Sequence, residues 1–267
     1  MSKPLPFTKD AILCLSHFGT ETKSTISNMI CYACESNGVE LAKYDADGQN
    51  NTTFKRYALR DKNGTALPNE KQDAVKGCKK FNFETEALEI ANVLGSDIEK
   101  LLIDFPARAV EKALAMFGDE ETFYNMFNMY ERNLIIAIPV ASDKSFISVK
   151  TFYESVDTLE LEHPVTFALV KNTGFLKATN CLAQVEKLYE EDIYVTAMRT
   201  NPKFNLIEVS VTTKYDEKGY IHQALADRKL SEVMEIPRSQ QVPVVHILLS
   251  SIKKDSTELF KKLIVRE

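Results

Sequence analysis

The sequence contains no apolar run of the length that spans a membrane, and its first ten residues, MSKPLPFTKD, do not form the apolar core of a signal peptide. It also lacks a surplus of basic residues, because 33 lysines and arginines stand against 38 aspartates and glutamates, a formal net charge of −5. This balance argues against a surface that is basic all over for nucleic acid, while leaving room for a local patch. We therefore expect a soluble cytoplasmic protein.

The five cysteines form no disulfide framework, and an odd number of them suits a reducing compartment. Cys31 and Cys34 make a C-x-x-C pair inside an apolar helical pattern, and no second pair is present. Two buried helical cysteines are the simpler interpretation, and a metal or redox site is the alternative.

The composition is that of an ordinary globular protein, with 267 residues, 44% of them hydrophobic and 27% charged. Six short apolar runs bounded by turn residues predict strands at 11–16, 39–45, 100–106, 133–140, 165–172 and 231–237. Helical patterns alternate with them at 23–37, 84–97, 107–131, 144–158, 177–190 and near 255–265. This alternation predicts a three-layer α/β fold, in which helices cover both faces of a mostly parallel sheet.

Two stretches do not follow the alternation. Residues 60–82 are polar and rich in turn residues, which predicts a surface excursion. Residues 191–230 combine a possible β run at 204–213 with a short helix at 220–230, and we interpret them as an insertion before the last strand. No repeat, low-complexity tract or linker divides the chain, so a single domain over residues 1–267 is expected.

The first predicted strand leads into SHFGTETKST, which has the position of a phosphate-binding loop but a single glycine, Gly19. Lys23, Ser24 and Thr25 follow at the start of the next predicted helix. Backbone N–H groups at a helix start favour anions, a lysine adds a positive charge, and the hydroxyl after it can ligate Mg²⁺.

Two other predicted strands end in carboxylates. Asp45 and Asp47 stand in YDADGQNNTTF, and Asp104 ends the apolar run of LLIDFP. Ligands bind at the carboxyl ends of parallel strands, and a carboxylate there can anchor a metal-bound water beside phosphates. Each piece alone has a simpler explanation, such as a helix cap or a solvated loop carboxylate. Their order along the chain favours a nucleotide site.

These three motifs together resemble the ParA/MinD family of deviant-Walker P-loop ATPases. The family loop K-G-G-x-G-K-S/T-T is similar to residues 18–25, FGTETKST. The family's D-x-D-P-Q-x-x-x-T is similar to DADGQNNTT, and its D-x-P is matched at residues 104–106. The resemblance covers about residues 10–170, with looser similarity over 231–265.

The resemblance implies ATP and Mg²⁺ as ligands. Lys23 would bridge the β- and γ-phosphates, Ser24 would ligate Mg²⁺, and Thr25 would hydrogen-bond the α-phosphate. Gly19 and Thr22 would form part of the loop around the phosphates. The implied chemistry is a slow ATP hydrolysis that switches a nucleotide-dependent dimer.

Further residues take roles by the same resemblance. Asp104 would hold the metal's outer water, Asp45 would support the Mg²⁺ region, and Asp47 would orient the attacking water. Asn172 and the turn at Pro237 would flank the adenine base.

The loop departs from the family pattern at several positions. Phe18 occupies the place of the signature lysine, and an apolar ring cannot supply that charge. Thr20 and Thr22 occupy glycine positions, where a β-branched residue is costly if φ is positive. Glu21 adds a negative charge beside the expected phosphates. These departures leave ATP hydrolysis open.

Three hypotheses remain from the sequence. The first is a ParA-like ATPase, expected to be a homodimer, that positions or transfers plasmid DNA or other cargo through a partner protein. The second is a non-hydrolysing relative that acts as a binding module. The third is a small-molecule ligase on a P-loop scaffold. The C-terminal segment IKKDSTELFKKLIVRE is amphipathic, and we expect it to be packed on the sheet rather than bound to membrane, with non-specific DNA contact as a possible use of its lysines.

Overall fold

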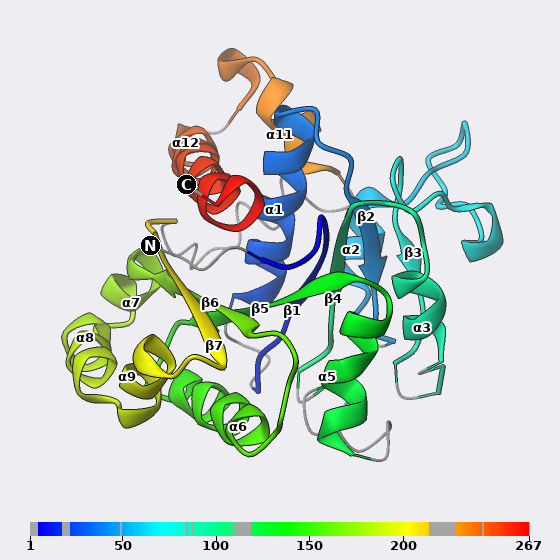
Figure 1. Cartoon of the computed structure of the whole chain (residues 1–267). Helices are drawn as coiled ribbons and strands as arrows, with labels where there is room; N and C mark the ends of the chain where they lie inside the picture. The colour runs from blue at the N-terminus through cyan, green and yellow to red at the C-terminus, as the bar shows by residue number, and fades with distance from the viewer. Residues whose placement is uncertain are drawn as a thin grey trace.

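The computed structural model describes residues 5–17, 22–48, 50–83, 85–86, 88–107, 109, 119–213, 228–241 and 243–266. A seven-stranded sheet in the order β3-β2-β4-β1-β5-β6-β7 forms its centre, and every neighbouring pair is parallel (Figure 1). The strands are β1 (Lys9–Cys14), β2 (Ala42–Asp45), β3 (Lys79–Lys80), β4 (Lys100–Asp104), β5 (Arg132–Val140), β6 (Val165–Asn172) and β7 (Phe204–Val211). Five of these strands match the apolar runs that the sequence analysis identified.

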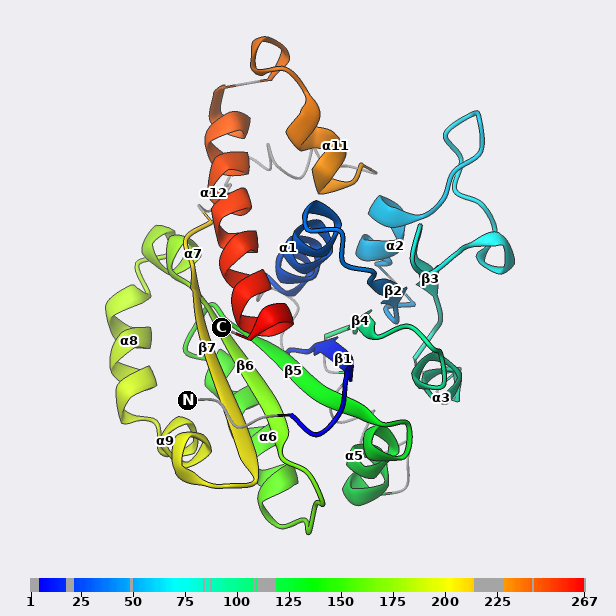
Figure 2. The ribbon, with the colours of Figure 1, turned by 45° about the horizontal axis from the view of Figure 1, so that its top comes forward.

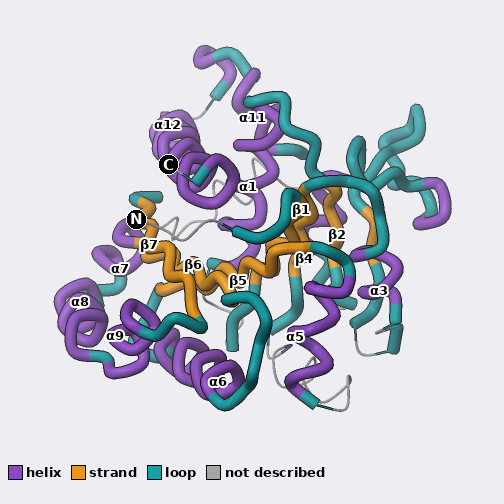
Figure 3. Tube along the Cα trace, viewed as in Figure 1, coloured by secondary structure: helices purple, strands orange, loops and turns teal. Residues whose placement is uncertain are grey.

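Helices cover both faces of the sheet, as expected for strands that are apolar on both sides (Figures 2 and 3). One layer contains α1 (Lys23–Ser36), α2 (Thr52–Tyr57), α11 (Leu230–Glu235), α12 (Pro243–Leu259) and the π-helical turn η3 (Phe260–Val265). The other contains α3 (Glu89–Leu94), α5 (Glu120–Met129), α6 (Ser145–Asp157), α8 (Leu182–Glu191) and α9 (Ile193–Thr200). Alternate residues of β1 enter the two cores, since Ile12 packs in the first and Leu13 in the second. The three-layer α/β architecture is therefore confirmed.

The first half of residues 191–230, which we interpret from the sequence as an insertion, contributes a helix and a strand to the central fold. Residues 193–200 form α9, and β7 pairs with β6 in parallel along eight positions from Phe204 to Val211. One face of this edge strand is exposed at Glu208 and Ser210, so polar residues alternate along β7. This pattern differs from the continuous apolar runs of the central strands, and it did not show from the sequence that β7 belongs to the central sheet. The helix expected at 220–230 falls mostly on residues 220–227, which lie outside the described residues.

The prediction of a strand at residues 231–237 is wrong. Residues 230–235 form the helix α11, in which Leu230 and Val233 are buried together on one side. A spacing of three residues places these two side chains on the same face of a helix, whereas in a strand they would point to opposite faces. The short apolar run was compatible with either structure.

Two other expectations are refined. The excursion at 60–82 is mostly turns, with a 3₁₀ turn η1 (Asn69–Lys71), but it ends in the edge strand β3. Of the helix expected at 107–131, α5 accounts for residues 120–129, and 110–118 lie outside the described residues.

The C-terminal amphipathic segment packs on the sheet, as predicted. Leu259, Leu263 and Ile264 are buried in the core, while the four lysines of the segment face solvent: Lys253, Lys254, Lys261 and Lys262. Within the described part of the chain, none of the helices combines the length and hydropathy that crossing a membrane requires.

Candidate functional site

The register of the sheet brings the predicted carboxylates to one place. Strand β4 lies between β1 and β2, so its last residue, Asp104, stands opposite Cys14 on one side and Asp45 on the other. All three strands run in the same direction, and the segments after them therefore leave from the same edge of the sheet. The segment that follows β1 and the D-x-D turn both start at this edge.

Lys23 and Asp104 form a buried ion pair. The Lys23 Nζ lies 3.2 Å from Asp104 Oδ1, and the two side chains are 10% and 4% exposed. Burial acts to lower the pKa of Lys23, but the charge and the hydrogen bond of Asp104 outweigh burial, and the pKa ends above its ordinary value. Lys23 is therefore a cation at neutral pH, aimed at the end of β4.

The second oxygen of Asp104 is bound from another direction. Thr53, in the first turn of α2, donates its hydroxyl to Asp104 Oδ2 at 2.7 Å. Both carboxylate oxygens are thus engaged, one by the residue after the loop of β1 and one by the helix after β2. Asp104 therefore links Lys23 and Thr53, which are 30 residues apart in the sequence.

Asp45 orders the turn that follows its own strand. Its Oδ1 accepts a hydrogen bond from the backbone N–H of Asp47 at 3.0 Å, and its Oδ2 accepts one from the N–H of Phe54 at 2.9 Å. Burial, and then the nearby charge of Asp104, raise the pKa of Asp45 to about 7. Asp45 therefore sits near the midpoint of its titration at neutral pH.

Asp47 is half-buried and closes a local turn. Its two carboxylate oxygens accept hydrogen bonds from the backbone N–H and the side-chain amide of Asn50, at 3.0 and 3.1 Å. The charge of Asp47 also contributes to the raised pKa of Lys23, after the contribution of Asp104. Asp47 is thus within electrostatic reach of Lys23 but points its acceptors into its own turn.

The loop enters α1 through a strained residue. Thr22 has φ 59° and ψ 16°, in the left-handed region that favours glycine. It stands where the family loop has a glycine, so the backbone requirement is present although the residue type has changed. Gly19, like Phe18, Thr20 and Glu21, lies outside the described residues.

The start of α1 has the features of a phosphate site. The N-cap residue Thr22 makes no capping hydrogen bond with its side chain, and its buried Oγ1 has no hydrogen-bond partner among the described residues. Uncapped N–H groups at a helix start attract anions, and Lys23 adds a full positive charge. Ser24 and Thr25 are half-buried in the same first turn. The residues present therefore fit a bound phosphate group.

A metal ion would need ligands beyond the protein at this place. The described part of the chain contains no group of three or more His, Cys, Asp or Glu side chains that could hold a metal. Mg²⁺ is commonly held by one or two carboxylates together with phosphate oxygens and water. The Ser24 hydroxyl, Asp45 and Asp104 fit that pattern, with phosphates completing the set.

The two residues predicted to flank a base lie in different places. Asn172 ends β6 at the carboxyl edge of the sheet, is buried, and accepts the N–H of Phe175 on its Oδ1 at 3.0 Å, which caps α7 (Thr173–Ala178). Pro237 lies instead toward the other end of α1. Its neighbours Ile236 and Arg238 line a hollow of about 250 Å³ together with Tyr32, which lies in the C-terminal half of that helix. The preceding helix α11 is bound to Glu35, which holds this turn away from Lys23.

The C-x-x-C pair is not a reactive site. Cys31 and Cys34 are fully buried in α1, and burial raises the pKa of the Cys34 thiol to about 12. Cys14 behaves in the same way at the end of β1, where burial and Asp104 raise its pKa to about 12. These thiols are neutral packing groups.

Comparisons with known proteins give similarity at the level of solved structures. The pNOB8 ParA bound to nonspecific DNA has a TM-score of 0.48 and 13% identity, over 97% of this chain and 98% of that one. The MinD cell division protein of Aquifex aeolicus has a TM-score of 0.44 and 13% identity, over 92% and 96%. The McdA–ATP complex of Cyanothece has a TM-score of 0.44 and 15% identity, over 93% and 96%. No family model matches the chain, and no curated protein sequence does either.

These three structures are a ParA, a MinD and a McdA protein. Identities of 13–15% and TM-scores below 0.5 say nothing about activity, so the function has to follow from this chain's own site.

Thr53 belongs to the candidate site but is not singled out by the sequence. It stands at the threonine of the motif D-x-D-P-Q-x-x-x-T, so a signal was present, but the motif alone assigned it no contact. Its bond to Asp104 depends on α2 turning back over the end of β4, which only the folded structure reveals.

Proposed function

We propose that this protein is a ParA-like ATP-binding protein that works as a slow ATPase switch. The observation that carries the proposal is the buried contact of Lys23 and Thr53 with Asp104, beside Asp45, at the carboxyl ends of β1, β2 and β4. A cation, a hydroxyl and two carboxylates then lie directly beside an uncapped helix start. This is the chemistry that a nucleoside triphosphate with Mg²⁺ requires.

In this proposal Lys23 exchanges partners when ATP binds. Its ammonium group is held by Asp104 in the free protein and would turn from that carboxylate to the phosphates of a bound nucleotide. Ser24 would ligate Mg²⁺, and Asp104 would hold a water of the metal's shell. The metal would supply charge neutralisation at the phosphate oxygens.

Hydrolysis requires Asp47 to reorient. Its carboxylate must leave the amide groups of Asn50 before it can orient an attacking water. In the sequence, Thr22 and Phe18 replace residues that the family loop uses for close approach and charge. The second candidate function, a nucleotide-binding module that does not hydrolyse ATP, is favoured by this engaged Asp47.

The proposal extends to the partners of this protein. We propose a homodimer that acts with a partner protein on plasmid DNA or other cargo in the cytoplasm. The exposed lysines of the C-terminal helix, such as Lys253 and Lys254, offer contacts for DNA phosphates, which would make binding strongly dependent on salt. Thr25 at the α-phosphate and Asn172 near the base complete the proposed nucleotide contacts.

The test compares ATP binding with phosphate release. Wild-type protein, Lys23→Ala and Asp47→Asn are measured with Mg²⁺, and Lys150→Ala, an exposed lysine of α6, is the matched control. We expect Lys23→Ala to lose ATP binding, and Asp47→Asn to bind ATP but release phosphate at least tenfold more slowly than wild type. Equal, slow release by wild type and Asp47→Asn would favour the non-hydrolysing module. Absence of ATP binding by the wild type at millimolar concentration would refute the nucleotide site.

A further inference from the structure

A second concentration of positive charge lies outside the strand-end site. A hollow of about 390 Å³ is lined by four cationic side chains and one carboxylate: Arg56, Arg60, Arg228, Lys229 and Glu232. We call it the basic hollow. It lies between α2, the polar excursion after it, and the start of α11. The whole chain has a net charge of −5, so the excess of positive over negative side chains around this hollow is opposite in sign to the charge of the chain.

Arg56 contributes the innermost charge of the basic hollow. It stands in the last turn of α2 and is only 5% exposed. Burial lowers the pKa of Arg56 from its usual range, although Tyr57 and Asp104 oppose the shift. Because folding has already removed this guanidinium from water, an anion that reaches it does not have to displace a full hydration shell.

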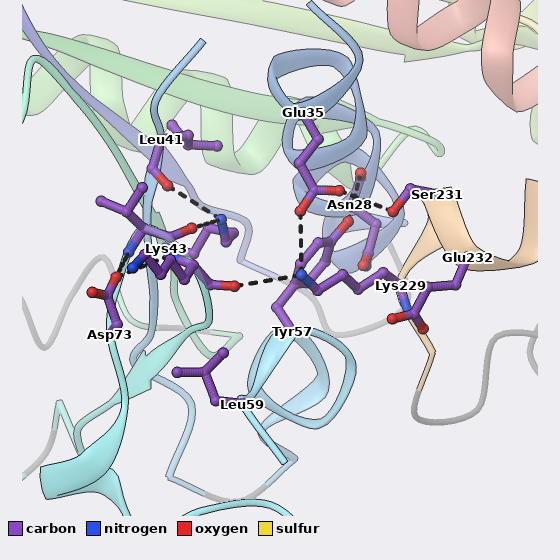
Figure 4. A network of polar contacts seen from close by, with 12 residues as sticks. Asn28, Glu35, Leu41, Lys43, Tyr57, Leu59, Asp73, Lys229, Ser231 and Glu232 are labelled. Atoms are coloured by element: carbon purple, nitrogen blue, oxygen red, sulfur yellow. Dashed lines mark hydrogen bonds and ion pairs between the residues drawn. The ribbon is translucent and has the colours of Figure 1, made fainter. Parts of the chain in front are cut away.

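The cations at the rim are held in position. Arg60 donates from Nη1 to the carbonyl oxygen of Gly64 at 2.8 Å and from Nη2 to that of Lys55. Figure 4 shows Lys229 between α1 and α2, with its ammonium group 3.8 Å from Glu35 Oε1 and over the ring of Tyr57. Side chains that are already oriented lose less conformational entropy when a ligand binds.

The single carboxylate of the basic hollow has a structural task. Glu232 Oε2 accepts the backbone N–H of Lys229 at 3.1 Å, which satisfies the N-cap N–H at the start of α11. Its position is therefore explained by the helix start. The four cations come from two distant stretches of the chain, 56–60 and 228–229, and the fold brings their charges together around one hollow.

We propose that the basic hollow binds a small molecule that carries a phosphate group. Arginine offers planar, forked N–H donors that match phosphate oxygens, and three arginines line the hollow. A volume of about 390 Å³ lies in the range of small-ligand sites, roughly 300–1,000 Å³. The innermost charge is buried, and a compact phosphate group can reach it more readily than a polymer lying across the rim.

The basic hollow is separate from the strand-end site, although α2 contributes to both. Thr53 in the first turn of α2 contacts Asp104, while Arg56, three residues later, lines the hollow. An anion can in principle occupy either place. The experiment must therefore remove the first site in order to observe the second.

The test titrates inorganic pyrophosphate by calorimetry into Lys23→Ala protein, without metal. Binding should persist in this background, and it should weaken about tenfold or more with Arg228→Gln or Arg60→Gln added. Arg238→Gln removes an exposed arginine outside the basic hollow and should leave the affinity unchanged. If Lys23→Ala does not fold, the double variant Lys23→Met/Asp104→Asn serves as the background.

The proposal is overturned if pyrophosphate does not bind in the Lys23-deficient background, or if Arg228→Gln binds it with the same affinity as the Arg238→Gln control. A parallel titration with duplex DNA gives a third outcome. The proposal is also overturned if Arg228→Gln or Arg60→Gln weakens the binding of DNA but not that of pyrophosphate. Far-ultraviolet circular dichroism and thermal unfolding confirm that each variant is folded. Because the strand-end site is disabled throughout, failure of the nucleotide proposal would leave this result unaffected.

Discussion

Asp45 and Asp104 stand directly opposite each other as the last residues of two neighbouring parallel strands. Two buried carboxylates on paired residues of neighbouring strands disfavour each other's ionisation. Burial and Asp104 together raise the pKa of Asp45 to about 7, whereas Lys23 and Thr53 bind the oxygens of Asp104 directly. Burial and the neighbouring Asp104 therefore disfavour the ionised form of Asp45.

This relationship predicts how stability depends on pH. The folded-state pKa of Asp45 lies above its unfolded value, so the protonated form favours folding, and stability falls as pH rises from about 4 to about 7. Relative to Asp45→Asn, which cannot ionise, the wild type should lose roughly 2 kcal/mol of unfolding free energy between pH 5 and pH 8. Urea unfolding of both proteins across this range measures the difference.

The control for the pH prediction is Asp97→Asn, which removes an exposed carboxylate at the opposite end of the sheet. Its stability difference from wild type should change little over the same pH range. If the difference in unfolding free energy between wild type and Asp45→Asn does not change with pH, the raised pKa of Asp45 is contradicted.

The ion pair of Lys23 and Asp104 predicts strong coupling between the two residues. Lys23→Met leaves the Asp104 carboxylate buried without its cation, and we expect a loss of about 3 kcal/mol in unfolding free energy without nucleotide. Lys23→Met/Asp104→Asn removes both charges and should recover part of that loss. A double-mutant cycle, measured by urea unfolding, gives the coupling; additive effects of the two substitutions would show that the pair contributes nothing to the free protein.

Thr53 predicts a clear difference between two nearly isosteric substitutions. Thr53→Val keeps the shape but loses the hydroxyl that donates to Asp104 Oδ2, which should cost about 1–3 kcal/mol in a buried site. Thr53→Ser keeps the donor and should be closer to wild type. Chemical unfolding of both variants tests this order, and a Thr53→Ser protein less stable than Thr53→Val would contradict it.

Thr22 predicts a gain in stability on substitution. Its left-handed conformation costs a threonine about 1–2 kcal/mol, and glycine adopts it without that cost. Because glycine also makes the unfolded chain more flexible, we expect a net gain of about 0.5–1 kcal/mol for Thr22→Gly. Thr25→Gly, at a right-handed helical position of α1, is the matched control and should be destabilising.

Much of the fold was predictable because the central strands are covered on both faces. Their apolar residues are nearly continuous, and that pattern marked five strands, including the whole of β6. The edge strand β7 and the helix α11 carry weaker patterns, since one has an exposed face and the other is a short run of ambiguous period. Tertiary pairing with β6 and packing against α1 decide those two elements.

The candidate site was predictable to the same degree. The carboxyl ends of parallel strands meet at one edge, so strand-end residues such as Asp45 and Asp104 could be grouped from the sequence alone. The contact of Thr53 depends on the return path of α2, and the position of Pro237 depends on α11 binding Glu35. The spacing of residues along the sequence predicts neither the position of α2 over β4 nor the position of Pro237.

Gly174 tests whether β7 is integral to the fold rather than part of an insertion. A Cβ atom at this position of α7 would come within 2.2 Å of the carbonyl oxygen of Thr213 and 2.5 Å of that of Thr212, just past the end of β7. These backbone atoms are held in turn by Asp255 of α12, which accepts the N–H of Thr212 at 2.8 Å and the hydroxyl of Thr213 at 2.7 Å.

Since neither side of this contact can yield at low cost, Gly174→Ala should destabilise the protein by about 3 kcal/mol or more. Gly38→Ala is an informative control, because its positive φ of 66° brings strain but no neighbouring atom lies within 4 Å, and a smaller loss of about 1 kcal/mol is expected. Thermal and urea unfolding compare the two variants. If Gly174→Ala is no worse than Gly38→Ala, the close packing of α7 against the end of β7 is wrong, and with it the placement of residues 204–211 at the edge of the sheet.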